Sequence, residues 1–124
     1  MSGNKILVDT NIVIYHLNGD STIEVLLDNK NVFISFITEI ELKSQKISNQ
    51  AERVIDKFIG FSTVVHSNNK ITLEAARLRK NKSIKVPDAI IAATSKVLSL
   101  PLITADKVFS GIAGLDVIEY QPRL

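Results

Sequence analysis

The chain has 124 residues, of which 45% are hydrophobic and 23% are charged, and its formal net charge is +2. These values are typical of one globular domain, so residues 1–124 are expected to fold as a single unit. The absence of cysteine excludes disulfide bonds and thiolate metal sites, and no apolar run has the length of a membrane span. The N-terminal stretch lacks a signal-peptide pattern, which favours a cytoplasmic location, and the small positive charge permits a polyanionic partner without requiring one.

Short aliphatic runs without alternating polar residues indicate buried strands. Such runs occur at Lys5–Val8, Val32–Phe36, Thr63–Val65, Leu102–Thr104 and Asp116–Glu119. Helical patterns separate them, at Thr22–Asn29, Asn49–Phe58, Ile71–Lys82 and Pro87–Leu100. Strands that alternate with helices predict an α/β fold in which a mostly parallel sheet of four to five strands is covered by helices on both faces.

Acidic residues follow several of these predicted strands. Asp9 comes directly after the first strand, Glu41 lies in the first turns after the second, and Asp106 comes directly after the fourth. Parallel sheets bind ligands at the carboxyl ends of their strands, so these acids are expected at one edge of the sheet. Asp88 lies in the first turn of the helix before the fourth strand, and its position relative to that edge depends on the fold.

Each of these acids also has a purely structural interpretation. Asp9 and Asp106 could cap the turns that follow them. Asp88 could complement a helix dipole, and Glu41 could be a solvated helix residue. These interpretations do not explain why Asp9 and Asp88 stand in apolar surroundings. Acids that share one edge repel each other, and a Mg²⁺ or Mn²⁺ ion removes that repulsion because it prefers carboxylate oxygens.

Four stretches in this order carry a family resemblance; they read VDTNIVIY, ISFITEIEL, PDAIIAATS and LITADKVFSGIAGLDVI. Together they resemble a PIN-domain ribonuclease and, within that superfamily, a VapC-type toxin, over essentially the whole chain. The resemblance implies a three-layer α/β/α sandwich, hydrolysis of RNA with Mg²⁺ or Mn²⁺, a homodimer, and inhibition by a small VapB-like antitoxin protein. The alternatives are a housekeeping RNA-processing nuclease of the same fold and a non-catalytic interaction module, which would be expected to lack one of the family's acids.

The resemblance implies that four acids carry catalysis: Asp9, Glu41, Asp88 and Asp106. Three of them are the expected metal ligands, with Asp9 and Asp106 binding directly and Asp88 binding directly or through water. Asp88 and Glu41 are also the candidates for deprotonating the attacking water, and the sequence leaves the division of these roles open.

Four polar residues match supporting positions of the same motifs: Asn11, Ser35, Thr38 and Thr104. Asn11 and Thr104 are expected to orient ligands or water, and simple capping is the alternative for both. The match departs from the family at ELKSQK, where relatives usually have a small residue or glycine after the Glu-Leu pair. It departs again at Val108, where some relatives carry one further acid near the last motif.

Two glutamates, Glu39 and Glu41, compete for the acidic position of the second motif. If Ile37 and Ile40 face the core, a rotation of about 100° per residue puts Glu41 at the rim of that face and points Glu39 to solvent. This choice agrees with the family pattern Thr-x-x-Glu-Leu, which is read here over residues 38–42.

Five basic residues lead into Asp88: Arg77, Arg79, Lys80, Lys82 and Lys85. They are the expected RNA-contacting surface, because backbone phosphates are bound by lysine and arginine. A solvated helix end, whose cations complement the helix dipole, explains them equally well. The five phenylalanines are expected in the core rather than in base stacking.

Two other enzyme classes fit the sequence less well. Haloacid-dehalogenase-like phosphatases also begin with an Asp after the first strand, but they need a second acid two residues later, where this chain has Asn11. A metal-free ribonuclease would rely on a histidine pair, and the only histidines, His16 and His66, lie far apart and outside any motif.

Overall fold

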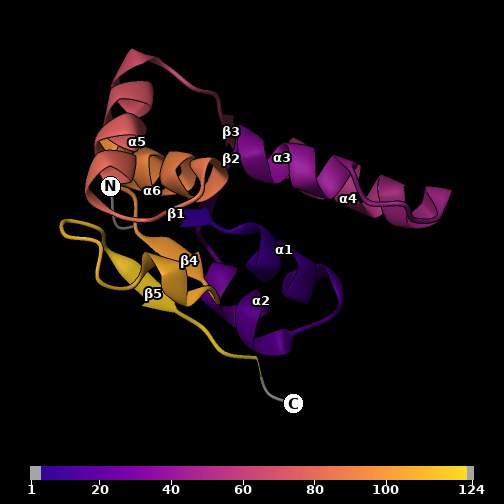
Figure 1. Ribbon diagram of the computed structural model, residues 1–124. Coiled ribbons are helices and arrows are strands. Elements are labelled where there is room, and N and C mark those ends of the chain that lie inside the picture. Colours follow the sequence, from indigo (N-terminus) through magenta and orange to yellow (C-terminus); the bar gives the residue numbers. More distant parts are fainter. Residues whose placement is uncertain (1–3, 123–124) are drawn as a thin grey trace.

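The computed structural model describes residues 4–122, which form a parallel sheet between two layers of helices (Figure 1). The strands have the spatial order β3-β2-β1-β4-β5, and all neighbours are parallel. Their bounds are β1 Lys5–Val8, β2 Asn31–Ser35, β3 Thr63–Val65, β4 Leu102–Thr104 and β5 Val117–Glu119. The predicted α/β/α sandwich with a parallel sheet is therefore confirmed.

The helices occupy the segments between the strands. Their bounds are α1 Thr10–Leu17, α2 Ser21–Leu27, α3 Phe36–Lys43, α4 Asn49–Phe61, α5 Asn69–Asn81 and α6 Val86–Leu98, with a short 3₁₀ helix η2 at Lys107–Phe109. Within residues 4–122, none of the helices has the length and apolarity that crossing a bilayer requires.

Alternating side chains of the central strands build two separate cores, because successive residues of a strand point to opposite faces. Leu7 and Leu102 pack with α5 and α6 on one face. Ile6, Val8 and Ile103 pack with α1, α2, α3 and α4 on the other face. Both faces of β1 are thus apolar, which explains why its sequence does not alternate.

The order of the strands puts the carboxyl ends of β1 and β4 next to each other. The chain adds β2 and β3 on one side of β1 and then crosses over to add β4 and β5 on the other side. Val8 pairs with Ile103, and the backbone N–H of Asp9 donates to the carbonyl oxygen of Ile103 at 3.0 Å. A reversal of this kind leaves a crevice at the strand ends, which is where such sheets bind ligands.

Two predicted boundaries shift for local reasons. Ser35 accepts a hydrogen bond from the N–H of Ile37 at 3.1 Å, so α3 begins at Phe36 and β2 ends one residue earlier than predicted. Ser99 takes a left-handed conformation with φ of 54°, which ends α6 before the predicted Leu100.

The prediction that all phenylalanines lie in the core is wrong for Phe61. Phe109 is 1% exposed, but Phe61 is 81% exposed at the end of α4. At about 100° per residue, Phe61 lies roughly 240° around the helix from Ile55, the buried residue of α4. It therefore faces away from the core.

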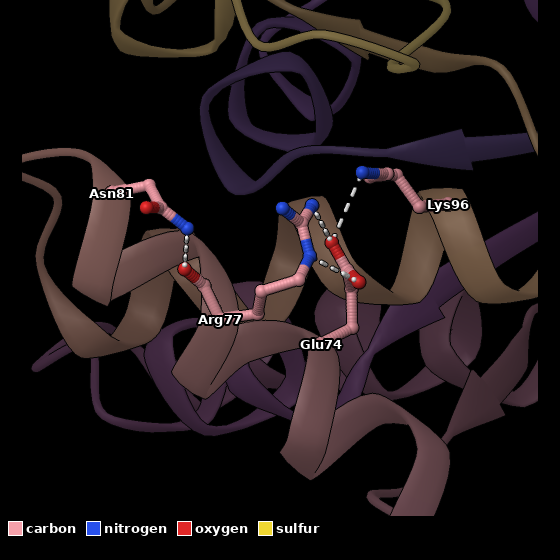
Figure 2. A network of polar contacts seen from close by, with 4 residues as sticks. All are labelled: Glu74, Arg77, Asn81 and Lys96. Carbon is pink, nitrogen blue, oxygen red and sulfur yellow. Dashed lines mark hydrogen bonds and ion pairs between the residues drawn. The ribbon is translucent and has the colours of Figure 1, made fainter.

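A shared carboxylate ties α5 to α6, as Figure 2 shows. On α5, Arg77 donates from Nε and Nη2 to the two carboxylate oxygens of Glu74, at 3.0 and 2.6 Å. Lys96 on α6 lies 3.0 Å from Oε2 of the same carboxylate. The hydrogen bonds from Arg77, followed by those from Lys96, lower the pKa of Glu74 to about 2. The ionised form of Glu74 is therefore favoured by folding.

We expect Glu74→Gln to destabilise the protein in a pH-dependent way. Because the pKa of Glu74 is lowered from 4.5 to about 2 by folding, its contribution is complete above pH 4.5 and disappears as the pH falls towards 2. Solvent screening limits the loss for the variant to about 1 kcal/mol at neutral pH. Urea unfolding followed by circular dichroism measures this difference. Glu52→Gln, which removes an exposed partner of Lys43, is the matched control and should change stability very little. An equal loss of stability in both variants would contradict the stabilising role of Glu74 between α5 and α6.

Candidate active site

Asp9 is a buried carboxylate at the end of β1, where it caps α1. Only 7% of the residue is exposed, and each of its two carboxylate oxygens accepts a hydrogen bond. Oδ1 accepts from the backbone N–H of Thr10 at 2.9 Å, and Oδ2 accepts from the hydroxyl of Thr104 at 2.6 Å. Burial raises the pKa of Asp9, these two hydrogen bonds oppose the rise, and the charges of Asp88 and Asp106 add to it. The capping interpretation is correct for Asp9, but it does not account for the neighbouring acids.

Thr104 links Asp9 to Asp106. Its hydroxyl is 0% exposed and donates to Asp9, while its oxygen accepts the backbone N–H of Asp106 at 3.0 Å. Asp106 itself is exposed, and its Oδ1 caps η2 by accepting from the N–H of Val108 at 3.0 Å. One buried hydroxyl thus fixes the relative positions of two of the predicted site residues.

Asp88 comes to the same edge from a different element. It lies in the first turn of α6 and is half-buried. Burial raises the pKa of Asp88, the charges of Asp106 and Glu41 raise it further, and Lys85 lowers it. The charges of Asp88 and Asp106 thus act on Asp9, and those of Asp106 and Glu41 act on Asp88, so the four acids that the sequence indicated lie at one edge of the sheet.

The helix-phase argument for Glu41 rested on a wrong assumption. Ile40 is 55% exposed, and the residues of α3 that face the core are Thr38 and Leu42. With the buried face centred between these two, Glu39 and Glu41 both lie about 80° from its centre, on opposite sides. Helical phase alone does not distinguish the two glutamates.

A tertiary contact does distinguish them. The hydroxyl of Thr10 donates to Oε1 of Glu41 at 2.6 Å, and Glu41 is the glutamate whose charge acts on Asp88. Thr10 stands inside the first motif, between Asp9 and Asn11, but its position in the sequence does not mark it as a partner of Glu41. Glu41, and not Glu39, thus contacts the first motif.

Two of the other supporting residues form hydrogen bonds between different elements, and one caps a helix. Asn11 accepts the backbone N–H of Ala105 at 3.3 Å, which ties α1 to the segment after β4. Ser35 is 1% exposed and caps α3. Thr38 is 0% exposed, and its Oγ1 lies 3.0 Å from Oγ1 of Thr10. Ser35 therefore has a structural explanation that needs no ligand.

The five basic residues before Asp88 do not all line the same hollow. Arg79 and Lys85 line a hollow of about 480 Å³ together with Asp88, Asp106 and neighbouring residues. Arg79 is held there by a hydrogen bond from its Nε to the carbonyl oxygen of Ile84 at 3.0 Å. The remaining basic residues lie elsewhere: Arg77 in the ion pair with Glu74, and Lys80 and Lys82 exposed at the end of α5.

The chemistry of the site fits a hard divalent cation. Within residues 4–122, no three acidic, histidine or cysteine side chains already surround one position as metal ligands would. The available donors are nevertheless carboxylate oxygens, and burial and mutual repulsion raise the pKa of both Asp9 and Asp88. A cation of the Mg²⁺ or Mn²⁺ type prefers such oxygens and would offset that repulsion.

Comparisons with known proteins agree with this architecture. The sequence model of the PIN domain matches residues 6–115. No protein of curated function matches the sequence. A toxin–antitoxin complex from Klebsiella pneumoniae contains a chain 29% identical to this one, with a TM-score of 0.79 over 91% of this chain and 95% of that chain.

Two further solved structures are similar. VapBC-1 from nontypeable Haemophilus influenzae is 28% identical, with a TM-score of 0.73 over 93% of this chain and 97% of that chain. VapBC2 from Rickettsia felis, bound to a DNA fragment from its promoter, is 24% identical, with a TM-score of 0.80 over 94% and 99% of the two chains. These likenesses confirm the predicted resemblance and the PIN-like fold.

Asp9→Asn is expected to keep or raise the stability of the metal-free protein at neutral pH. Since burial raises the pKa of Asp9 in the folded state, the ionised carboxylate opposes folding as the pH rises through that pKa. The advantage of the variant should therefore shrink as the pH falls towards 3.8. Thermal melting in EDTA across this range measures it. Asp9→Ala, which also loses the cap, should be less stable by about 1 kcal/mol than Asp9→Asn; an Asp9→Asn variant less stable than the wild type would contradict the prediction, because the charge of Asp9 would then stabilise the metal-free fold.

Proposed function

The chain belongs to the PIN domain family, and on this basis we propose that it is a metal-dependent endoribonuclease that serves as the toxin of a toxin–antitoxin pair. The observation that supports this most is the carboxylate of Asp9 at the ends of β1 and β4, whose pKa is raised by burial and further by the charges of Asp88 and Asp106. A helix cap requires only one polar residue, whereas four acids that come together from different elements can bind a cation, which in turn would bind a phosphate.

The proposed mechanism is hydrolysis of an RNA phosphodiester bond. Asp9, Asp88 and Asp106 would hold Mg²⁺ or Mn²⁺, which supplies charge that polarises a phosphate oxygen and lowers the pKa of an attacking water. Thr104 keeps Asp9 and Asp106 in register through its two hydrogen bonds. The carboxylate of Glu41 or Asp88 takes the proton of the water. The water oxygen bonds to phosphorus as the bond to the 3′-oxygen breaks, and the leaving 3′-oxygen takes up a proton from solvent, which leaves a 5′-phosphate and a 3′-hydroxyl.

Arg79 and Lys85 are the basic residues proposed to contact RNA near the reaction centre. Both line the hollow that also contains Asp88 and Asp106, so a phosphate next to the cleaved bond would lie within their reach. Arg79 keeps its Nη groups for such a contact, because its bond to Ile84 uses Nε. Arg77 is better explained as a structural residue. Lys80 and Lys82 would contribute only a general attraction.

A small antitoxin is the proposed partner, as in the toxin–antitoxin complexes that the chain resembles. Two surfaces suit such a protein. The acidic edge would accept an arginine, whose planar group pairs with carboxylates. An apolar hollow of about 310 Å³ between α1, α3 and α4, which includes Leu17, Leu42 and Val54, would accept an apolar segment.

The remaining expectations also stand as proposals. Residues 1–124 are proposed to form one domain that works in the cytoplasm as a homodimer. Analytical ultracentrifugation of the purified chain tests the dimer, and a monomer at micromolar concentration would contradict it.

Purified protein should cleave single-stranded RNA with Mg²⁺ and stop when EDTA is added. Asp9→Asn and Glu41→Gln should lose more than the roughly 100-fold that loss of a supporting residue near a metal causes. Glu39→Gln is the matched control, because it changes the same chemistry on the same helix away from the Thr10 contact. Cleavage by the Asp9 variant at the normal rate would reject the proposed site. A greater loss of cleavage for Glu39→Gln than for Glu41→Gln would reject the assignment of Glu41 to that site.

Lys85→Ala should weaken RNA binding, measured in the Asp9→Asn background so that the RNA stays intact. Loss of one phosphate contact should reduce the slope of log affinity against log salt by about 0.7 for single strands. Lys80→Ala removes the same charge at the end of α5 and should have a smaller effect. Equal losses and slopes would assign both lysines to a general electrostatic attraction.

Expression of the chain alone should arrest bacterial growth, and Asp9→Asn should not. Co-expression of a cognate antitoxin should restore growth, because it would cover the acidic edge. Colony counts after induction measure both effects. Harmless expression of a folded and active nuclease would point instead to a housekeeping role in RNA processing.

A further inference from the structure

The contact between Thr10 and Glu41 extends beyond one hydrogen bond. Oγ1 of Thr10 lies 2.6 Å from Oε1 of Glu41 and 3.0 Å from Oγ1 of Thr38. A hydroxyl has one proton to donate. The shorter contact to a charged carboxylate takes the proton of Thr10, because such hydrogen bonds are the stronger ones. The Thr38 hydroxyl is the second acceptor within reach of the same proton.

We propose that Thr10 is a positioning residue for Glu41 and that its hydroxyl sets how well Glu41 serves the ion and the attacking water. This inference rests on the proposed function, since it assumes that Glu41 acts at the site. Thr10 contacts neither the ion nor RNA in this role; it acts through Glu41.

Glu41 needs such support because of where it lies. It is exposed on α3, and a free glutamate side chain samples many rotamers. Thr38 is 0% exposed, and threonine side chains are stiff at their first torsion. Thr10 on α1 therefore holds the flexible carboxylate with a hydroxyl on a stiff side chain.

The same residue also contacts a second acid. The backbone N–H of Thr10 donates to Oδ1 of Asp9 at 2.9 Å. Thr10 thereby connects an acid at the end of β1 with an acid on α3. Thr10 bonds to Oε1 of Glu41, and within the described residues Oε2 has no hydrogen-bond partner. Oε2 is therefore the oxygen available to bind an ion or accept a proton.

Two substitutions separate the hydroxyl from the bulk of the side chain. Thr10→Val keeps the shape and removes the hydroxyl, whereas Thr10→Ser keeps the hydroxyl. We expect Thr10→Val to weaken Mn²⁺ binding, measured by calorimetry without RNA, and to lower kcat by roughly 10-fold with little change in KM. Thr10→Ser should stay close to the wild type. Thr22→Val, at an exposed position at the start of α2, controls for the loss of a threonine.

A double-mutant cycle with Glu41→Gln decides whether Thr10 acts through Glu41. In the Glu41→Gln background, Thr10→Val should cause no further loss of Mn²⁺ affinity. A penalty of equal size in both backgrounds would make Thr10 a structural residue and overturn the proposal. Unchanged Mn²⁺ affinity and cleavage in Glu41→Gln alone would also overturn it, because nothing would remain to be positioned. A wild type that binds Mn²⁺ but cleaves no RNA would reject the nuclease function, while a non-additive cycle in Mn²⁺ affinity would still support the role of Thr10.

Discussion

The hydrogen bond from the Thr104 hydroxyl to Oδ2 of Asp9 is the contact on which the rest of the site depends. It joins the ends of two adjacent parallel strands, and both residues are buried. Without donors, a charge in this apolar layer would be strongly unfavourable. With the Thr104 hydroxyl on one oxygen and the Thr10 amide on the other, the carboxylate of Asp9 stays at the strand end although burial raises its pKa.

The atoms that complete the fold here are also the atoms that the proposed site needs. Asp9 caps α1 and Asp106 caps η2, so helix formation itself orients both carboxylates. Asp88 lies in the first turn of α6, where a negative charge is favourable to the helix. The cost is that burial, together with a concentration of like charge, raises the pKa of Asp9 and Asp88. A divalent cation would offset this cost, which couples stability to function.

The paired helices α5 and α6, with the connection between them, supply the basic residues of the site and Asp88. They carry Arg79 on α5, Lys85 in the connection between the helices and Asp88 on α6 to one hollow. The shared carboxylate of Glu74 fixes the two helices against each other (Figure 2). Arg77 and Arg79 are two residues apart, and so about 200° apart around α5. One arginine therefore stabilises the helix pair while the other lies beside the acids.

The sequence by itself determined the layers of the fold and most of the acidic edge. Aliphatic runs without alternation marked strands buried on both faces, and the position directly after a strand placed Asp9 and Asp106 at the carboxyl edge of the sheet, because these are properties of the local chain and of parallel sheets. The tertiary structure decided the rest. Ile40 was expected to face the core and is exposed, so helical phase does not select Glu41, and only its contact with Thr10 distinguishes it from Glu39.

The same limit applies to the basic stretch. Arg77 and Arg79 have the same chemistry and nearly the same sequence surroundings, and nothing local to the chain separates them. Their roles differ because Glu74 lies within reach of one and the carbonyl oxygen of Ile84 within reach of the other. Periodicity reports which elements form, but the side of a helix that meets a given neighbour is set by the packing of the whole chain, where contacts between distant residues contribute free energy that no local pattern records.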